Sequence, residues 1–212
     1  MSLYSYISFP RPVDTSCLVS KFDKAKAFKV GDLRGTELEK QIDGGISSQL
    51  PDNVTVYLGD MTDLWGINIF DKHTESFDTV FNNKFIYRLE GDFDFGDTEK
   101  LIEQSMEIYH NSSEEENGGQ TEEEFMEFSV KLANDKKCCA TLCRQQLNDI
   151  VVLNAKPGES IEIYSIWTGN ESSDTYGPPT EVKKITNEEV ATTELLNLQE
   201  NVKIEIIRTV WK

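Results

Sequence analysis

The sequence predicts an α+β fold, with a mostly antiparallel sheet and two or more helices in the middle of the chain. Segments with strand-like alternation or β-branched clusters outnumber helical ones, and the longest helical patterns do not alternate regularly with strands. Of the 212 residues, 10% are aromatic, which supplies large side chains for a core. We expect a single domain over residues 1–212 with a mobile acidic loop at 111–120. Two lobes, 1–110 and 121–212, are the alternative.

In the first half of the chain, strands are expected where apolar residues alternate with polar ones or where β-branched and aromatic residues gather. These predicted strands are residues 1–9, 54–58, 65–70 and 84–89. The turn at 59–63 would join the second and third strands into a hairpin. Residues 15–42 hold helical possibilities, with Thr36 as a candidate cap.

Two helices are predicted mid-chain, on either side of a polar loop. Asp97 is a favourable N-cap for a helix over about 98–109, and Thr121 with Glu124 has the spacing of a capping box. The expected buried side of the first helix consists of Leu101, Ile102, Ser105, Met106, Ile108 and Tyr109. That of the second helix begins with Phe125, Phe128, Ser129, Leu132 and Ala133.

The last third of the chain is expected to return to the sheet. Residues 136–147 fit a strand or a helix, whereas 149–153 and 159–167 predict two strands around a turn at 156–158. A short helix is possible within 187–198. The alternation over most of 201–211 predicts a closing strand.

Negative charge is concentrated in one segment. Residues 90–127 contain fourteen acidic residues and one basic residue, so they carry −13 of the formal net charge of −17. The remaining 174 residues hold 24 acidic and 20 basic residues. A concentrated negative potential favours a cationic partner and accelerates its association.

The candidate partner-binding residues lie in this acidic segment. Glu99, Glu103 and Glu107 are spaced i, i+4, i+8, so they line one face of the first predicted helix. The other candidates add negative potential or flank this face: Asp92, Asp94, Glu114, Glu115, Glu116, Glu122, Glu123 and Glu124. The competing interpretation is a solvated face and an acidic loop that only keep the protein soluble.

A calcium loop over residues 92–103 is disfavoured. Carboxylates stand at loop positions 1, 3 and 12, but Gly96 takes a position that needs an oxygen ligand and Asp97 a position that needs glycine. Lys100 would place a cation among the ligands. We therefore expect no metal site and no cofactor.

Three of the four cysteines, Cys138, Cys139 and Cys143, lie within six residues of one another. They lack the paired spacing of a zinc site and no histidine is near, so small buried side chains are the preferred interpretation. A reactive thiol beside Lys136, Lys137 and Arg144 is the alternative, because cations lower a thiol pKa. The cysteine pattern also suggests a reduced, cytosolic chain.

Other functional classes have little support. Hydrolase, phosphate-loop and dinucleotide motifs are absent from the sequence, so no catalytic residues are predicted and the chain is expected not to be an enzyme. Direct nucleic-acid binding is disfavoured at a pI of about 4.5. The N-terminus does not fit a signal peptide and no apolar run is long enough for a membrane span, so a cytoplasmic protein is expected.

In size, charge and lack of a catalytic signature, the chain resembles bacterial immunity proteins, which neutralise nucleases or other toxic effector domains. The resemblance implies a non-enzymatic inhibitor that covers the cationic active-site cleft of a cognate toxin or nuclease. The alternatives are a nucleic-acid mimic that blocks a DNA- or RNA-binding protein, an uncharacterised cytosolic enzyme, and a scaffold protein with an inert acidic loop.

Overall fold

The computed structural model describes residues 2–18, 26–36, 50–58, 66–72, 77, 79–94, 96–113, 119–168, 178–196 and 198–209. The chain divides into two compact units, one formed by 1–18 with 66–212 and the other by 19–65. Both mid-chain helices belong to the first unit. The mobile loop expected at 111–120 falls partly on residues 114–118, which lie outside those described.

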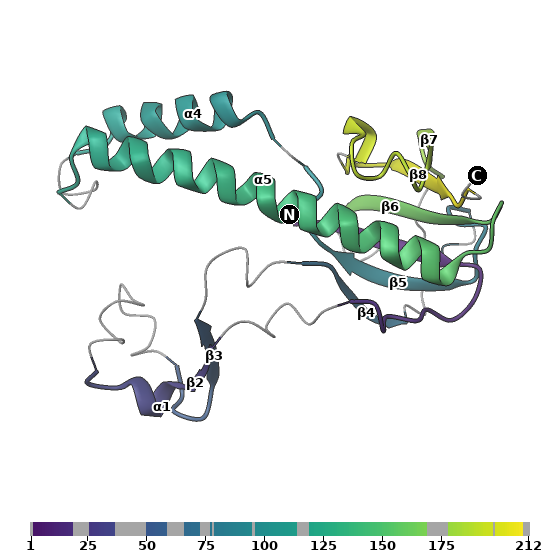
Figure 1. Ribbon diagram of the computed structural model, residues 1–212, viewed down its shortest axis with the longest axis horizontal. Helices are drawn as coiled ribbons and strands as arrows, with labels where there is room; N and C mark the ends of the chain where they lie inside the picture. The colour runs from purple at the N-terminus through teal and green to yellow at the C-terminus, as the bar shows by residue number, and fades with distance from the viewer. Residues whose placement is uncertain are drawn as a thin grey trace. The chain divides into compact units, whose positions relative to one another are not determined.

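The first unit contains a six-stranded sheet in the order β4-β5-β1-β6-β8-β7 (Figure 1). Its strands are β1 (Ser2–Phe9), β4 (Asn68–Lys72), β5 (Phe85–Glu90), β6 (Ser160–Thr168), β7 (Glu181–Thr186) and β8 (Val202–Ile207). All neighbouring strands pair antiparallel except β7 and β8, which are parallel. The predicted α+β fold with a mostly antiparallel sheet is confirmed.

Two long helices form a hairpin in this unit. α4 (Thr98–Asn111) begins at Asp97, whose carboxylate accepts a hydrogen bond from the Lys100 amide at 3.1 Å. α5 (Glu122–Asn154) is opened by the predicted capping box of Thr121 and Glu124. At 33 residues α5 is roughly 50 Å long. α4 has 14 residues and can therefore pack along only part of α5. A short 3-10 helix, η2 (Glu194–Leu196), precedes β8.

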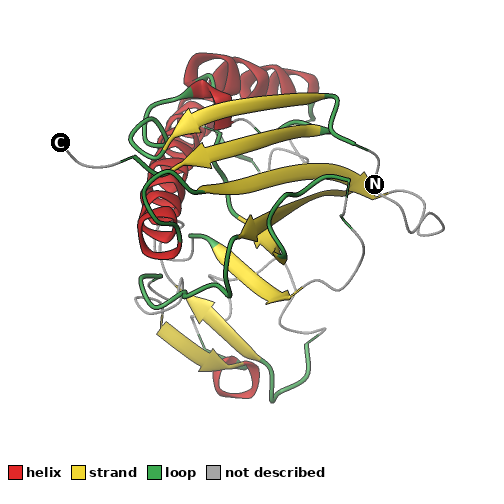
Figure 2. Ribbon diagram, turned by 90° about the vertical axis from the view of Figure 1, so that its right-hand side faces the viewer, coloured by secondary structure: helices red, strands yellow, loops and turns green. Residues whose placement is uncertain are grey.

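The C-terminal half of α5 covers one face of the sheet (Figures 1 and 2). Because side chains alternate along a strand, every second residue of β1, β6 and β8 points to this helix. Ile7, Ile163 and Ile204 pack there in one buried cluster with Leu147 and Ile150 of α5. The opposite face carries a smaller cluster, in which Tyr6 and Tyr164 pack with Phe77 and Phe81.

The second unit contains a two-stranded antiparallel sheet of β2 (Lys26–Lys29) and β3 (Thr55–Leu58), with Phe28 opposite Val56. A one-turn helix, α1 (Val30–Leu33), follows β2. Residues 26–29 are thus a strand within the segment for which helix was considered. The helix expected after Thr36 falls on residues outside those described.

Two predictions of local structure are wrong, and one strand is missing from the predicted set. The predicted hairpin of 54–58 with 65–70 does not form, because β3 pairs with β2 and β4 pairs with β5. Residues 149–153 are the last turns of α5 and not a strand. A short run of Ile and Val fits a buried helix face as well as a buried strand, and here the helix continues through it. β7 was not predicted at all.

The expected buried faces of the two helices are also partly wrong. Met106, Ser129 and Ala133 are buried, but Ile108, Phe128 and Leu132 are 64%, 53% and 39% exposed. The N-terminal half of α5 contacts α4 along one side, and a single partner helix covers only a narrow strip of another helix.

Candidate partner-binding surface

The acidic row, which we define as Glu99, Glu103 and Glu107, lies on α4 and all three side chains are exposed. Successive members are one helical turn apart, about 6 Å along the axis. Among the residues that the structure describes, no Lys, Arg or His lies within ion-pair distance of these carboxylates. The row is therefore an uncompensated line of negative charge.

The three glutamates at the start of α5 are exposed but differ in their contacts. The Glu124 carboxylate accepts hydrogen bonds from the backbone amide and the hydroxyl of Thr121 at 2.9 and 3.0 Å, which lower its pKa. Glu122 Oε1 lies 3.2 Å from His110 Nε2. Glu123 has no ion pair among the described residues. Of the three carboxylates, only that of Glu124 takes part in the capping box of α5.

Contacts across the hairpin set the alignment of α4 and α5. The ring centroids of Tyr109 and Phe125 are 4.8 Å apart, and the Tyr109 hydroxyl donates to the Gln120 carbonyl at 2.9 Å. Together with the pair of His110 and Glu122, they bring the end of α4 beside the start of α5. The structure thus places the acidic row and the acidic first turn of α5 on one hairpin.

The remaining acidic candidates lie elsewhere or outside the described residues. Glu114, Glu115 and Glu116 are not among the described residues. Asp92 and Asp94 lie between β5 and α4, where their carboxylates accept hydrogen bonds from the backbone amides of Asp94 and Gly96 at 3.1 and 2.9 Å.

The segment 92–103 does not have the form of a calcium loop. Gly96 adopts a φ of 64° in a turn, and from Thr98 onward the segment is helix, so Glu103 points out from α4. No group of three or more His, Cys, Asp or Glu side chains that could hold a metal occurs within the described part of the chain.

Arg144 fixes the base of the hairpin to the rest of the unit. Its side chain is fully buried, and Nε donates to the Phe93 carbonyl at 2.7 Å while a terminal nitrogen donates to the Thr193 carbonyl. Burial lowers the pKa of this guanidinium, and the charges of Asp94 and Asp92 oppose that shift. These two aspartates therefore face a structural cation of their own chain.

Hydrophobic side chains that the sequence pattern did not single out as exposed lie on the same hairpin. They are Ile108, Met126, Phe128, Val130 and Leu132, with exposed fractions from 39% to 64%. Exposed apolar groups beside polar ones are a feature of protein-binding surfaces. α5 is longer than α4 and than any strand of the sheet, so these elements leave part of its surface uncovered. The length of the helix is therefore the signal that could have indicated exposed apolar side chains.

Cys139 does not offer a reactive thiol. Cys139 is 2% exposed, and burial, with the charges of Asp135 and Asp92, raises its thiol pKa to about 11. A thiol with that pKa stays protonated, so the suggested activation by neighbouring cations is wrong for Cys139. Cys143 is also buried, as preferred, whereas Cys138 is exposed.

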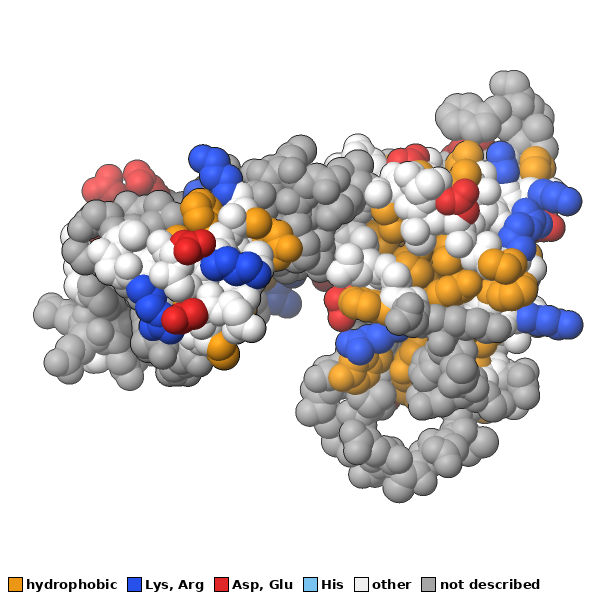
Figure 3. Space-filling model, turned by 90° about the horizontal axis from the view of Figure 1, so that it is seen from below, with side chains coloured by type: hydrophobic (Ala, Val, Ile, Leu, Met, Phe, Trp, Pro, Cys, Tyr) orange, Lys and Arg blue, Asp and Glu red, His pale blue; other side chains and the backbone are white. Residues whose placement is uncertain are grey.

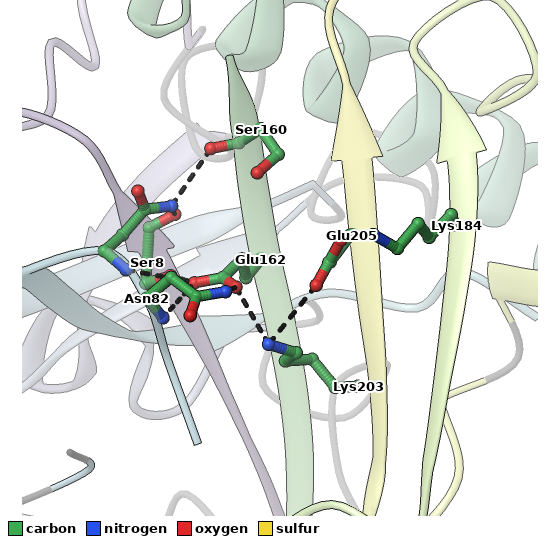
Figure 4. Close-up of polar contacts among 8 residues, drawn as sticks. Ser8, Asn82, Ser160, Glu162, Lys184, Lys203 and Glu205 are labelled. Carbon is green, nitrogen blue, oxygen red and sulfur yellow. Dashed lines mark hydrogen bonds and ion pairs between the residues drawn. The ribbon is translucent and has the colours of Figure 1, made fainter. Parts of the chain in front are cut away.

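A second cluster of charges is buried in the sheet (Figure 4). Glu162 on β6 is fully buried and accepts hydrogen bonds from Ser8 Oγ and from the backbone amides of Asn82 and Asn83 at 2.8–3.1 Å. Lys203 on β8 lies 2.9 Å from the same carboxylate. Because Glu162 is fully buried, a substrate cannot reach its carboxylate. Its hydrogen bonds with Asn82 and Asn83 hold the segment before β5 against the sheet.

The surface charge is unevenly distributed. Over the sheet-bearing part in Figure 3, basic side chains stand among the acidic ones and hydrophobic side chains gather between them. This mixture agrees with the near balance of acidic and basic residues outside 90–127. The excess of negative charge therefore belongs to residues 90–127, which include the acidic row.

Comparison with protein-family models, curated proteins and solved structures gave no match. None of the described helices is both long and apolar enough to cross a membrane. The functional assignment therefore depends on the residues of this chain alone.

Proposed function

We propose that this chain is a non-enzymatic binding protein that neutralises a cationic toxin or nuclease domain by covering its active-site cleft, as immunity proteins do. The α4–α5 hairpin supplies the contact surface. In this proposal the protein acts in the cytoplasm of a bacterium and needs no cofactor.

The observation that carries the proposal is the uncompensated acidic row on an exposed helix. Like charges one turn apart destabilise a helix by a few tenths of a kcal/mol per pair. The acidic row keeps two such pairs, and no described Lys or Arg lies within ion-pair distance of its carboxylates to offset them. A cationic partner would remove this repulsion, and the negative potential would steer its approach.

The arrangement of the acidic row favours a protein partner over mimicry of nucleic acid. Its three carboxylates form a short straight row along one helix. The phosphates of a DNA strand instead wind around the axis of the duplex, with one about every 3.4 Å of that axis. Nucleic-acid mimicry remains the second candidate, because it would use the same electrostatic surface.

The test uses the neighbouring gene and an inhibition assay. We expect a toxin or nuclease domain to be encoded immediately upstream, and the purified protein to inhibit that domain. Charge reversal in Glu103→Lys/Glu107→Lys should slow association roughly tenfold at low salt and reduce its salt dependence, because electrostatic steering is lost.

Glu181→Lys is the matched control. Glu181 is an exposed acid on β7 of the sheet, outside the hairpin. This substitution changes the net charge by the same amount per residue and should slow association much less. Equal association rates for the parent and the Glu103/Glu107 double variant at low salt would contradict the proposal.

A further inference from the structure

The exposed hydrophobic residues of α5 divide between two sides of the hairpin. Met126 and Val130, which we define as the apolar row, follow Glu122 at i+4 and i+8 and are 40% and 39% exposed. Phe128 and Leu132 are each two residues further on, about 200° around the helix. They therefore face the other side.

The apolar row lies on the same side as the acidic row. Glu122 contacts His110. His110 follows Glu107 at i+3, so it lies about one turn beyond the acidic row on the same side of α4. Because the helices are antiparallel, Met126 lies beside residues 106–107 and Val130 beside 102–103. Met106 of α4, which lies in this stretch of the hairpin, is buried.

This face therefore has two edges of different chemistry. Along α4 it presents the three carboxylates of the acidic row, and along α5 it presents the side chains of Met126 and Val130. Basic and apolar side chains that lie on adjacent strips of one helix match both edges at once. Methionine adapts its shape to different apolar partners, which suits a docking surface.

We infer that the partner presents a basic amphipathic helix, which lies along the face formed by the acidic row and the apolar row. Its lysine or arginine side chains contact α4, and its apolar side chains pack on Met126 and Val130. This inference rests on the proposed function and makes the mode of binding specific.

Two synthetic peptides test the inference at low salt. The first is an amphipathic peptide of about 18 residues, made of Lys, Leu and Ala with leucines at i, i+3, i+4 and i+7. The second has the same composition in an order that forms no apolar stripe. Affinity is measured by fluorescence anisotropy. We expect the first peptide to bind more tightly and to gain helical circular dichroism on binding.

Substitutions on the two sides of α5 separate the contributions. Met126→Ser/Val130→Ser should weaken binding of the amphipathic peptide about tenfold, as loss of well-packed anchors does, and leave the second peptide unaffected. Phe128→Ser/Leu132→Ser, the same kind of change on the opposite side, should leave both affinities unchanged. Glu103→Lys/Glu107→Lys should weaken both. Parental helical circular dichroism in each free variant shows that it is folded.

Two outcomes overturn the inference without touching the proposed function. One is an unchanged affinity of Met126→Ser/Val130→Ser for the amphipathic peptide while the glutamate variant loses both peptides, since binding is then electrostatic only. The other is a loss confined to Phe128→Ser/Leu132→Ser, which places the contact on the opposite side. If the parent binds neither peptide, the proposed function fails together with the inference.

Discussion

At the scale of single residues, the most constrained group is the Glu162 carboxylate. It is completely buried, and Lys203 lies between it and Glu205, at 2.9 and 3.4 Å from the two carboxylates. Burial raises the pKa of Glu205, but the hydrogen bond from Lys184 and the charge of Lys203 outweigh this effect, so its pKa lies below the ordinary value. The four charges alternate in sign and compensate one another, with Glu162, Lys203 and Glu205 buried or nearly so and Lys184 largely exposed.

Replacing Glu162 by glutamine should destabilise the protein by about 3–5 kcal/mol, because Lys203 then remains buried without its closest counter-charge. Chemical denaturation followed by circular dichroism measures the free energy of unfolding. In the double variant Glu162→Gln/Lys203→Met, much of this loss should be recovered, since no unpaired charge is left. A cost below about 1 kcal/mol for Glu162→Gln would show that the pair does not hold the sheet.

At the scale of elements, α5 serves two purposes along its length. Its C-terminal half contributes Cys143, Leu147 and Ile150 to the main core, all fully buried. Its N-terminal half packs on α4 and buries only small side chains, Ser129 and Ala133. One continuous helix therefore joins the core to the proposed binding surface.

Two leucines of α5 test this division directly. Leu147→Ala should destabilise the protein by about 2–5 kcal/mol, because it leaves a cavity in the core. Leu132→Ala, the same change at a position that is 39% exposed, should cost less than about 1 kcal/mol. Thermal or denaturant unfolding compares them. Similar losses for both variants would mean that the N-terminal half of α5 is buried as deeply as the C-terminal half.

At the scale of the whole molecule, the net charge of −17 opposes folding through self-repulsion. The effect is largest where acidic side chains lie close together without a described ion pair, as in the acidic row. Association with a cationic partner would relieve it, so binding and stability should respond to salt in opposite directions.

Thermal stability should accordingly rise as salt increases from about 0.01 M to about 0.15 M, because the Debye length shortens from about 30 Å to about 8 Å. Differential scanning fluorimetry of the melting temperature measures the response. In Glu103→Gln/Glu107→Gln the increase should be smaller, since two repelling charges are gone. An identical salt response in parent and variant would place the repulsion outside the acidic row.

The elements that the sequence predicted correctly are marked by residue patterns within their own segments. Alternation defines β1, and the caps at Asp97 and Thr121 define the starts of α4 and α5. Where prediction failed, residues outside the local segment decide the outcome. β3 pairs with β2, which is further away in sequence than β4, and 149–153 continue a helix that began at Glu122. The exposure of Phe128 was missed for the same reason, since periodicity cannot tell how much of a helix its partner covers.

The sequence by itself determined the concentration of charge, the alignment of Glu99, Glu103 and Glu107 on one helical face, and the α+β class, because these depend on composition and on spacings of a few residues. Only the tertiary structure decided that Met126 and Val130 stay exposed on the hairpin that carries the acidic row, and that Glu162 is enclosed with Lys203. Those arrangements join residues far apart in the chain or on different elements. They exist only once the hairpin has closed and the strands have paired, which local spacing does not encode.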